Sequence, residues 1–252
     1  MSERHDAYRG FALHYDLHGW DWYASTYGAR LIRLIDEKGL SGCRVLDAGC
    51  GTGTLALDLA ERGHQVVGVD LSEAMMAVAR KKDAARKVSW QVGDITTLER
   101  APGEAPFGLV TCVADILNHL EHLDLWEQAF ARLGALLGAG GWLFFDVMTC
   151  RGLQRLDKFV AEERDGRMLI AAMVYEPAAR RSTVKVTSFA ERPGTGLFER
   201  ACETITEWGQ PVREILARLE SAGFDSITRP FAQDDDPEME DRLAILARKA
   251  GR

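Results

Sequence analysis

The sequence predicts an α/β protein built on a doubly wound, mostly parallel sheet of seven strands with a small antiparallel insertion. Short apolar runs alternate with amphipathic helical stretches between residues 44 and 147, which is the pattern of repeated strand–helix–strand units. The first run leads directly into a loop with glycine at alternate positions, and a helical stretch follows at once. Between residues 168 and 208 three extended runs follow one another with only short turns between them, which predicts an antiparallel meander.

Length and composition restrict the class of protein. The chain of 252 residues can bury one sizeable core plus a modest extension, and a hydrophobic fraction of 46% is ordinary for a soluble globular protein. No apolar run approaches the roughly 20 residues that cross a bilayer, and the polar N-terminus shows no secretory signal. Five scattered cysteines favour a reducing, cytoplasmic setting. Because the net charge of −7 disfavours contacts with phosphate, we expect no nucleic-acid partner, and because no apolar run is long enough to cross a bilayer, we expect no membrane partner.

The glycine loop covers residues 47–53, Asp-Ala-Gly-Cys-Gly-Thr-Gly, directly after the apolar strand Arg44 to Ala48. A strand, a glycine loop and a helix in this order place free backbone N–H groups and a helix N-terminus beside a ligand. The spacing departs from the dinucleotide pattern G-x-G-x-x-G, because the third glycine comes one residue too soon. A chain reversal without a ligand would also use such glycines, but the flanking strand and helix favour a binding loop.

This loop resembles the first motif of class I S-adenosylmethionine-dependent methyltransferases. The resemblance implies S-adenosyl-L-methionine as cofactor and S-adenosyl-L-homocysteine as product. It also implies that the loop binds the cofactor through Asp47, Ala48, Gly49, Cys50, Gly51 and Gly53.

The second strand, residues 65–70, ends in Asp70, about twenty residues past the glycines. A carboxylate at this strand end suits a hydrogen bond from a ribose diol, although an acidic residue at a helix start is the simpler alternative. Ser72 is expected to cap the next helix. We expect Leu71 and Met75, on either side of that cap, to contact the cofactor as well.

The third strand, residues 88–92, is followed by Gly93 and Asp94. In the methyltransferase family the matching acid hydrogen-bonds the adenine amino group, and the next apolar residue, here Ile95, packs on the ring. A turn-forming Gly-Asp pair is the alternative. The signal gains weight only in combination with Asp47 and Asp70.

The fourth strand, residues 107–113, leads into a stretch that resembles the part of these enzymes lying along the methionine portion of the cofactor. Val113 and Asp115 are therefore expected to bind cofactor, whereas Ile116 stands where relatives often carry serine. His119 is the only residue of residues 110–120 able to act as a base near neutral pH, so it is a candidate catalytic residue. A histidine held by hydrogen bonds in a loop is the alternative.

Residues 1–41 are rich in aromatic side chains and predict one or two helices that form a lid, ending at Lys38 and Gly39. Tyr15 and Asp16 resemble the N-terminal Tyr-Asp pair of small-molecule methyltransferases, in which the tyrosine helps to cover the cofactor. Tyr15 is thus a cofactor-binding residue and a second candidate base. His14 and His18 stand four apart, a metal-ligand spacing, but the sequence offers no third ligand. We therefore expect a solvated or hydrogen-bonded pair and no metal.

The C-terminal half completes the sheet. A helix over residues 123–137 is expected to stop at the glycines of residues 138–141, before a buried strand at residues 142–147. A further helix at residues 211–222 precedes two last strands at residues 224–231 and 243–248, with an acidic, solvated tip between them.

The expected domain organisation follows from this order. Residues 42–150 and 211–252 form the cofactor-binding domain, and residues 151–210 form the insertion. Similar insertions in sugar N-methyltransferases of antibiotic pathways roof the acceptor site or pair two subunits. The resemblance therefore implies that this insertion covers the acceptor, and it allows a homodimer.

The sequence favours a methyltransferase that transfers its methyl group in line to an N or O nucleophile of a small molecule. An NAD-dependent oxidoreductase on a similar fold is the alternative, against which stand the glycine spacing, Asp94 and the lack of a Tyr-x-x-x-Lys pair. A catalytically silent protein that only binds S-adenosylmethionine is a third reading, because the motifs specify a cofactor and not a reaction. No motif identifies the acceptor.

Overall fold

The computed structural model describes residues 8–192 and 194–251, and it confirms the predicted fold class. Seven strands form one sheet in the order β10-β11-β5-β4-β1-β2-β3. The five strands β1 (Arg44–Ala48), β2 (Gln65–Asp70), β3 (Val88–Val92), β4 (Phe107–Cys112) and β5 (Leu137–Met148) are parallel. Strand β11 (Arg242–Lys249) lies antiparallel between β5 and β10 (Phe224–Thr228).

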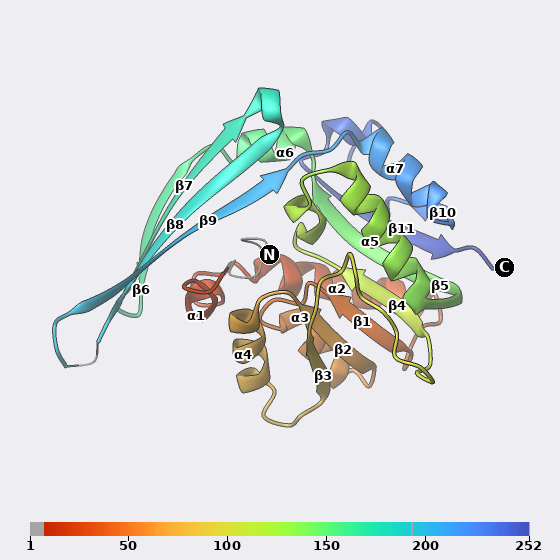
Figure 1. Cartoon of the computed structure of the whole chain (residues 1–252), viewed down its shortest axis with the longest axis horizontal. Coiled ribbons are helices and arrows are strands. Elements are labelled where there is room, and N and C mark those ends of the chain that lie inside the picture. Colours follow the sequence, from red (N-terminus) through yellow and green to blue (C-terminus); the bar gives the residue numbers. More distant parts are fainter. Residues whose placement is uncertain (1–7, 193, 252) are drawn as a thin grey trace.

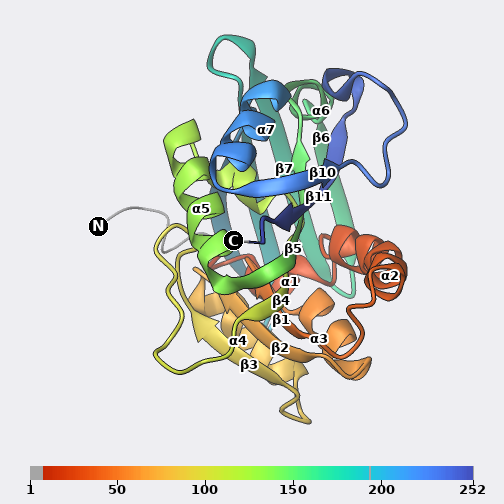
Figure 2. The same ribbon diagram turned by 90° about the vertical axis from the view of Figure 1, so that its right-hand side faces the viewer.

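Helices cover both faces of this sheet, as Figure 2 shows. On one face α5 (Leu123–Leu136) and α7 (Val212–Ser221) bury an apolar stripe that includes Trp126, Phe130 and Ile215. On the other face α2 (Trp22–Glu37) and α3 (Thr54–Glu61) bury Leu31 and Leu55 with their neighbours. The two faces are covered because β1, β4 and β5 are apolar on both sides, as parallel strands require. The remaining sheet-domain helix, α4 (Glu73–Lys82), begins at Ser72, whose side chain caps it as expected.

The insertion is a four-stranded antiparallel sheet, one strand more than the sequence predicted. Its strands are β6 (Phe159–Arg164), β7 (Arg167–Glu176), β8 (Arg181–Glu191) and β9 (Phe198–Trp208), in sequential order. The first strand escaped prediction because it is an edge strand with few buried side chains and three charged residues at its end. A tight Asp165-Gly166 turn joins it to β7, with both residues at positive φ, which is a strong hairpin signal. The short helix α6 (Cys150–Arg155) was also not predicted.

The predicted stop at the glycines of residues 138–141 is wrong in detail. Helix α5 ends at Leu136, and β5 begins at once with Leu137, so the glycines lie inside the strand. Gly140 adopts φ +70°, and the pairing of β4 with β5 shifts register at this point. The glycines therefore form an irregular strand start instead of a loop. Strand β10 also ends earlier than expected, at Thr228.

The N-terminal segment connects the two sheets. Its helices are α1 (Ala12–Tyr15) and α2, and the latter ends at Glu37 with Lys38 as its cap, as predicted. Phe11 packs against Leu169, Val184 and Ile205 on the inner face of the insertion sheet. Figure 1 shows α1 lying between this arching sheet and the seven-stranded sheet. In the described part of the chain, no helix is long and apolar enough to span a membrane.

Candidate active site

The glycine loop is held against the end of β2. The backbone N–H groups of Gly49 and Cys50 both donate to the carbonyl oxygen of Val69, at 2.7 and 3.0 Å. Gly49, Gly51 and Gly53 have positive φ angles, which glycine adopts without strain. A Cβ atom on Gly49 would also lie 2.6 Å from two carbons of Ile116. Gly53 immediately precedes α3, so the loop presents the N-terminus of this helix at the edge of the sheet.

Asp70 fixes the loop from the end of β2. Its carboxylate accepts hydrogen bonds from the N–H of Gly51 and the N–H of Ser72, each at 2.8 Å. Burial raises the pKa of Asp70, while these two hydrogen bonds oppose the rise. Leu71 is half-buried between them, and Met75 is buried in the first turn of α4. Asp70, the residue expected to bind the ribose, therefore joins two backbone segments, the glycine loop and the start of α4.

Asp47 lies one strand away, at the end of β1, with a residue exposure of 1%. One carboxylate oxygen accepts a hydrogen bond of 2.8 Å from the Thr111 hydroxyl, and the other has no partner among the described residues. Burial raises the pKa of Asp47 to about 7, and the charge of Asp70 adds to the rise. A buried oxygen without a donor is costly, so this atom fits a donor supplied by a ligand.

The third carboxylate of the predicted set, Asp94, follows β3. One of its oxygens accepts hydrogen bonds from the N–H and the hydroxyl of Thr96, at 2.8 and 2.7 Å. Ile95 is buried in the core beneath α5. The sheet order places the ends of β1, β2 and β3 side by side, as the prediction of a common edge requires.

The backbone after β4 is strained where it crosses this edge. Val113 is buried, and the next two residues, Ala114 and Asp115, have φ angles of +66° and +53°. Two consecutive left-handed residues other than glycine are unfavourable and are typical of functional sites. Side chains from neighbouring strands hold the strained pair. Asp146 at the end of β5 accepts from the N–H of Ala114 at 2.7 Å.

Arg242 joins these acidic residues. Its guanidinium donates to Asp146 and, at 2.9 Å, to Asp115, and it stacks over the ring of Tyr23 with its carbon 3.6 Å from the ring centre. Burial alone would lower the pKa of Arg242, but Asp115 and Asp146 hold it well above its ordinary value. This buried ion-pair network was not predicted. The signal was available, because Asp146 ends a parallel strand and an antiparallel β11 brings its first residue to the same edge.

His119 lies in a short 3-10 helix, Ile116–His119, and faces the N-terminal segment. Its Nδ1 lies 3.2 Å from the carbonyl oxygen of Thr206 on β9, and its Nε2 lies 3.3 Å from the Tyr8 hydroxyl. Because a carbonyl oxygen only accepts, Nδ1 carries the hydrogen in a neutral ring and Nε2 accepts from Tyr8. Tyr8, which sequence reasoning did not single out, thus orients the candidate base.

Tyr15 packs edge-on against Tyr8 and Phe11, with ring centres 5.9 and 5.7 Å apart. Burial raises the pKa of Tyr15 far above its ordinary value, and Asp115 and Asp70 contribute to the rise. Its phenol therefore stays protonated near neutral pH. Its neighbour Asp16 forms an ion pair of 2.7 Å with Lys82 at the end of α4 and accepts from Thr52 in the glycine loop. The N-terminal segment is thereby bound to the loop that it covers.

The two histidines of the N-terminal segment, His14 in α1 and His18 after it, lie against the insertion sheet. His18 Nδ1 lies 3.0 Å from a Glu162 oxygen on β6, and both His14 and His18 are buried. The pair is therefore hydrogen bonded through one member and not solvated. Within residues 8–192 and 194–251, no three potential ligands come together in a metal-binding group.

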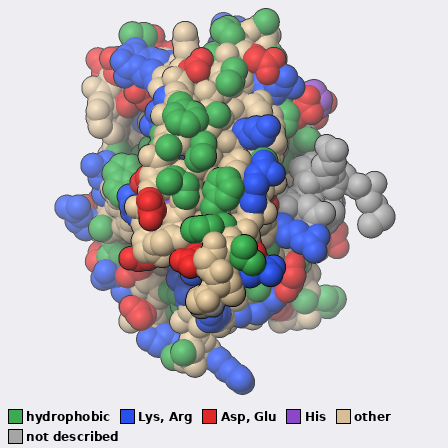
Figure 3. All heavy atoms as spheres, turned by 90° about the vertical axis from the view of Figure 1, so that its left-hand side faces the viewer, with side chains coloured by type: hydrophobic (Ala, Val, Ile, Leu, Met, Phe, Trp, Pro, Cys, Tyr) green, Lys and Arg blue, Asp and Glu red, His purple; other side chains and the backbone are tan. Residues whose placement is uncertain are grey.

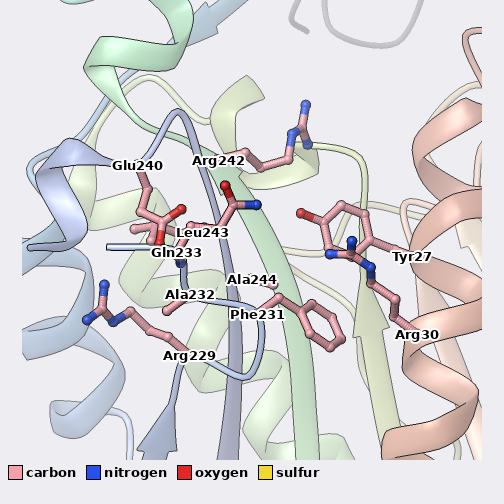
Figure 4. Close-up of a pocket in the computed structure, with 10 residues that line it drawn as sticks. All are labelled: Tyr27, Arg30, Arg229, Phe231, Ala232, Gln233, Glu240, Arg242, Leu243 and Ala244. Carbon is pink, nitrogen blue, oxygen red and sulfur yellow. Dashed lines mark hydrogen bonds between the residues drawn. The ribbon is translucent and has the colours of Figure 1, made fainter. Parts of the chain in front are cut away.

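Two cavities lie away from the glycine loop. The first, about 40 Å³ in volume, is enclosed by Tyr27 and Arg30 of α2 and by the β10–β11 connection. Figure 4 shows Tyr27 and Arg30 projecting from α2 toward Phe231 and Gln233 of that connection. The second, about 500 Å³, is lined by residues that include Cys150, Arg180 and Arg213. Since none of the strand-end carboxylates Asp47, Asp70 and Asp94 lines either one, neither is the predicted site.

The chain is similar to known methyltransferases. A family model described as a methyltransferase domain matches residues 45–141. A Geobacillus sp. (strain WCH70) protein named putative methyltransferase is 30% identical over 248 residues, which cover 96% of this chain and 99% of the relative.

Solved structures of similar fold cover almost the whole chain. An S-adenosylmethionine-dependent methyltransferase from Clostridium acetobutylicum has a TM-score of 0.80 at 21% identity, covering 97% of this chain and 99% of that one. An amino pentose methyltransferase from Micromonospora echinaspora, solved with S-adenosylmethionine bound, has a TM-score of 0.71 at 20% identity, covering 95% and 96%. Both coverages include the insertion sheet as well as the seven-stranded sheet.

Proposed function

This chain belongs to the class I S-adenosylmethionine-dependent methyltransferases, and we propose that it methylates an N or O nucleophile of a small-molecule acceptor. The observation that carries the acceptor class is the enclosure of the site. The N-terminal segment and β9 close over the strand ends, so that Tyr8, Tyr15 and His119 face inward and not onto an open surface. A small acceptor fits an enclosed site, whereas a nucleic acid needs an open basic groove.

S-adenosylmethionine, the methyl donor, supplies when bound a methyl group activated by a positively charged sulfur. The N-terminus of α3, which follows the glycine loop, and one oxygen of Asp47 fit such a ligand, since the helix end attracts an acceptor group and the oxygen has no donor among the described residues. The residues proposed to hold it are Tyr15, Asp47, Ala48, Gly49, Cys50, Gly51, Gly53, Asp70, Leu71, Met75, Asp94, Ile95, Val113 and Asp115.

His119 is proposed as the base that accepts a proton from the acceptor. In the tautomer set by the Thr206 carbonyl, the Nε2 lone pair points to the Tyr8 hydroxyl at 3.3 Å, where a nucleophile could replace it. Tyr15 is the weaker candidate for this role, because its raised pKa keeps the phenol protonated. We propose that Tyr15 covers the cofactor and donates a hydrogen bond instead.

The test of the base is His119→Ala. A general base contributes roughly 10²- to 10⁴-fold, so turnover should fall by at least 100-fold, and the acidic limb of its pH profile should disappear. If turnover and the pH profile are unchanged, the assignment is wrong. Tyr8→Phe, which removes the hydroxyl that holds the ring, is a milder companion variant with an expected loss of about tenfold.

The first experiment on the function itself is calorimetry with S-adenosylmethionine and with NAD. Binding of the sulfonium compound alone is expected, followed by release of S-adenosylhomocysteine when a panel of small acceptors is added. Binding without release across a broad panel would favour a silent binding protein. Capture of NAD in place of the sulfonium compound would contradict the proposal.

For the domains, we propose that residues 1–41 act as the lid, that residues 42–150 and 211–252 hold the cofactor, and that residues 151–210 cover the acceptor. Hydrogen exchange offers a direct test. S-adenosylhomocysteine should protect the glycine loop, residues 47–53, and an acceptor should add protection at residues 203–208. Protection of the loop alone by both ligands would contradict the division.

We also propose that two copies pair through the outer face of the insertion sheet. Figure 3 shows hydrophobic side chains gathered on this face. Three of its large apolar side chains, Phe159, Val174 and Phe198, are more than half exposed. The proposal predicts a dimer in sedimentation that Val174→Lys converts to a monomer. For location, we propose the cytoplasm, which the five free thiols support.

A further inference from the structure

Glu207 is a buried carboxylate on the acceptor side of the site. It lies near the end of β9, with a residue exposure of 9%, directly opposite Ser182 of β8. Its two neighbours in the strand are bound to the 3-10 helix that follows β4. Thr206 contacts the His119 ring through its carbonyl oxygen, and the Trp208 carbonyl accepts from Asn118 at 3.0 Å. The backbone on both sides of Glu207 is thereby held against the 3-10 helix that carries His119.

No described residue donates a hydrogen bond to the Glu207 carboxylate. The hydroxyl of Ser182, directly across the strand pair, is likewise buried without a partner among the described residues. Glu203, four residues earlier on the same face of β9, differs in that one of its oxygens accepts from the N–H of Gly10 at 2.7 Å. A carboxylate buried without donors is costly, and a fold retains it where a ligand supplies the missing partner.

Around Glu207, negatively charged groups outnumber positively charged ones. Arg242 is the cation that acts on it, but its guanidinium is already bound by Asp115 and Asp146. Three carboxylates therefore face one guanidinium. Burial raises the pKa of Glu207 to about 8, and the charge of Asp115 raises it further than Arg242 lowers it.

The aromatic side chains near Glu207 also suit a cation. Glu207 contributes to the raised pKa values of Tyr8 and Tyr15, so both rings lie within its electrostatic reach. Faces of aromatic rings attract cations, and a carboxylate beside them adds a charge-assisted hydrogen bond. The site thus offers an anion, aromatic rings and no free cation among the described residues.

We propose that Glu207 is the anchor for a protonated amine on the acceptor, so that the substrate is a small-molecule amine. This inference rests on the proposed function, since it identifies the acceptor class of the same site. The carboxylate binds the ammonium group by charge and hydrogen bonds, and Ser182 offers a second oxygen beside it. A neutral alcohol of the same shape leaves the buried anion without a counter-charge and binds more weakly.

The experiment compares three amines with their matched alcohols on the protein loaded with S-adenosylhomocysteine. Benzylamine, cyclohexylamine and glucosamine are titrated against benzyl alcohol, cyclohexanol and glucose at pH 8, by NMR or calorimetry. At least one amine should bind ten or more times as tightly as its alcohol. Glu207→Gln should reduce that ratio to below threefold, whereas Glu199→Gln, an exposed glutamate of the same strand, should leave it unchanged. Glu207→Asp, which retains the charge, should recover part of the preference.

Two outcomes would overturn the inference: no amine preferred over its alcohol in the wild-type protein, or a preference that survives in Glu207→Gln. If Glu207→Gln fails to fold, the wild-type preference is followed between pH 8 and pH 5.5 instead. It should fall at least fivefold for benzylamine and cyclohexylamine, because these two amines stay charged over that range while Glu207 gains a proton. A constant preference for both overturns the inference. His119, Asp115, Arg242, Tyr8 and Tyr15 are the other titratable or charged groups there, so His119→Gln is titrated in parallel and should show the same fall. Binding of S-adenosylmethionine is measured on each sample, and its loss in the wild-type protein would contradict the proposed function rather than this inference.

Discussion

Replacing Arg242 by methionine tests whether one guanidinium stabilises the acidic edge of the sheet. The side chain of Arg242 is 9% exposed and that of its partner Asp146 is fully buried. Methionine retains much of the apolar volume but leaves Asp146 without a counter-charge. Removing one partner of a buried ion pair costs about 3–5 kcal/mol, and the contact with Tyr23 adds to the loss. We therefore expect the free energy of unfolding to fall by about 4 kcal/mol at pH 8.

The loss should depend on pH, and its sign follows from Asp146. Burial already raises the pKa of Asp146 above its unfolded value while Arg242 lowers it, so the variant should raise it further. An acid whose pKa is higher in the folded protein binds its proton more tightly there. Its destabilising effect is absent below the unfolded pKa of about 4, and it grows until the pH passes the folded value. The difference between variant and wild type should therefore shrink to about 2 kcal/mol at pH 5.5.

Urea unfolding followed by tryptophan fluorescence, at pH 8 and at pH 5.5, measures both values. Arg248→Met is the matched control, because Arg248 lies on the same strand, is exposed and has no carboxylate partner among the described residues. It should cost less than about 1 kcal/mol at either pH. Adding Asp146→Asn to Arg242→Met should recover more than half of the loss. A loss below about 1 kcal/mol, or one equal at both pH values, would refute the buried ion-pair reasoning.

Three further variants test the site and its cover. Gly49→Ala places a Cβ atom at a residue with a φ of +75° and within 3.0 Å of Ile116, so cofactor affinity in calorimetry should fall at least tenfold. A second change, Ile116→Ala, removes the clash and should restore part of the affinity. Lys82→Met removes the partly exposed ion pair with Asp16, so stability should change by less than about 1 kcal/mol while cofactor dissociation in stopped-flow measurements accelerates. An unchanged dissociation rate would argue that this ion pair does not help to retain the cofactor. Phe11→Ala removes a side chain that is 1% exposed, so the free energy of unfolding, measured by calorimetry, should fall by about 3–5 kcal/mol. A fall near zero would mean that the N-terminal segment does not stabilise the insertion sheet.

The parallel half of the fold could be predicted because its signals are local. The strand ending in Asp47, the glycines after it and the cap at Ser72 each occupy a few consecutive residues, and each dictates its own geometry. Strand β6 could not be recognised in the same way. It has one neighbour, lies at an edge and buries almost nothing, so its sequence carries neither alternation nor a continuous apolar run.

The site residues fall into the same two groups, those that local sequence signals reveal and those that only the tertiary fold brings together. Asp47 and Asp70 lie at the ends of strands, and His119 follows one, whose positions the sequence reveals, so the crevice rule was sufficient to propose them. Arg242 and Glu207 lie on antiparallel strands far along the chain, and their roles depend on which residues the tertiary fold places opposite them. A carboxylate such as Glu207 resembles any polar residue of an exposed sheet until its burial is known. Its importance is a property of the packing and cannot be read from neighbouring residues.

The concentration of acids at one edge of the sheet has a physical reason. Burial raises the pKa of Asp47 to about 7 and that of Glu207 to about 8, so at pH 7 each group is protonated for half of the time or more in the ligand-free protein. Each therefore reduces the stability of the ligand-free protein as the pH rises from its unfolded pKa, about 4, to its folded pKa. Protein cations could have compensated them, yet Arg242 is bound by Asp115 and Asp146. A cation that binds beside such acids stabilises their charged forms, and the sulfonium donor is itself a cation. The lack of protein cations beside Asp47 and Glu207 thus destabilises the ligand-free protein. It also favours a positively charged donor at one end of the crevice and a positively charged acceptor at the other.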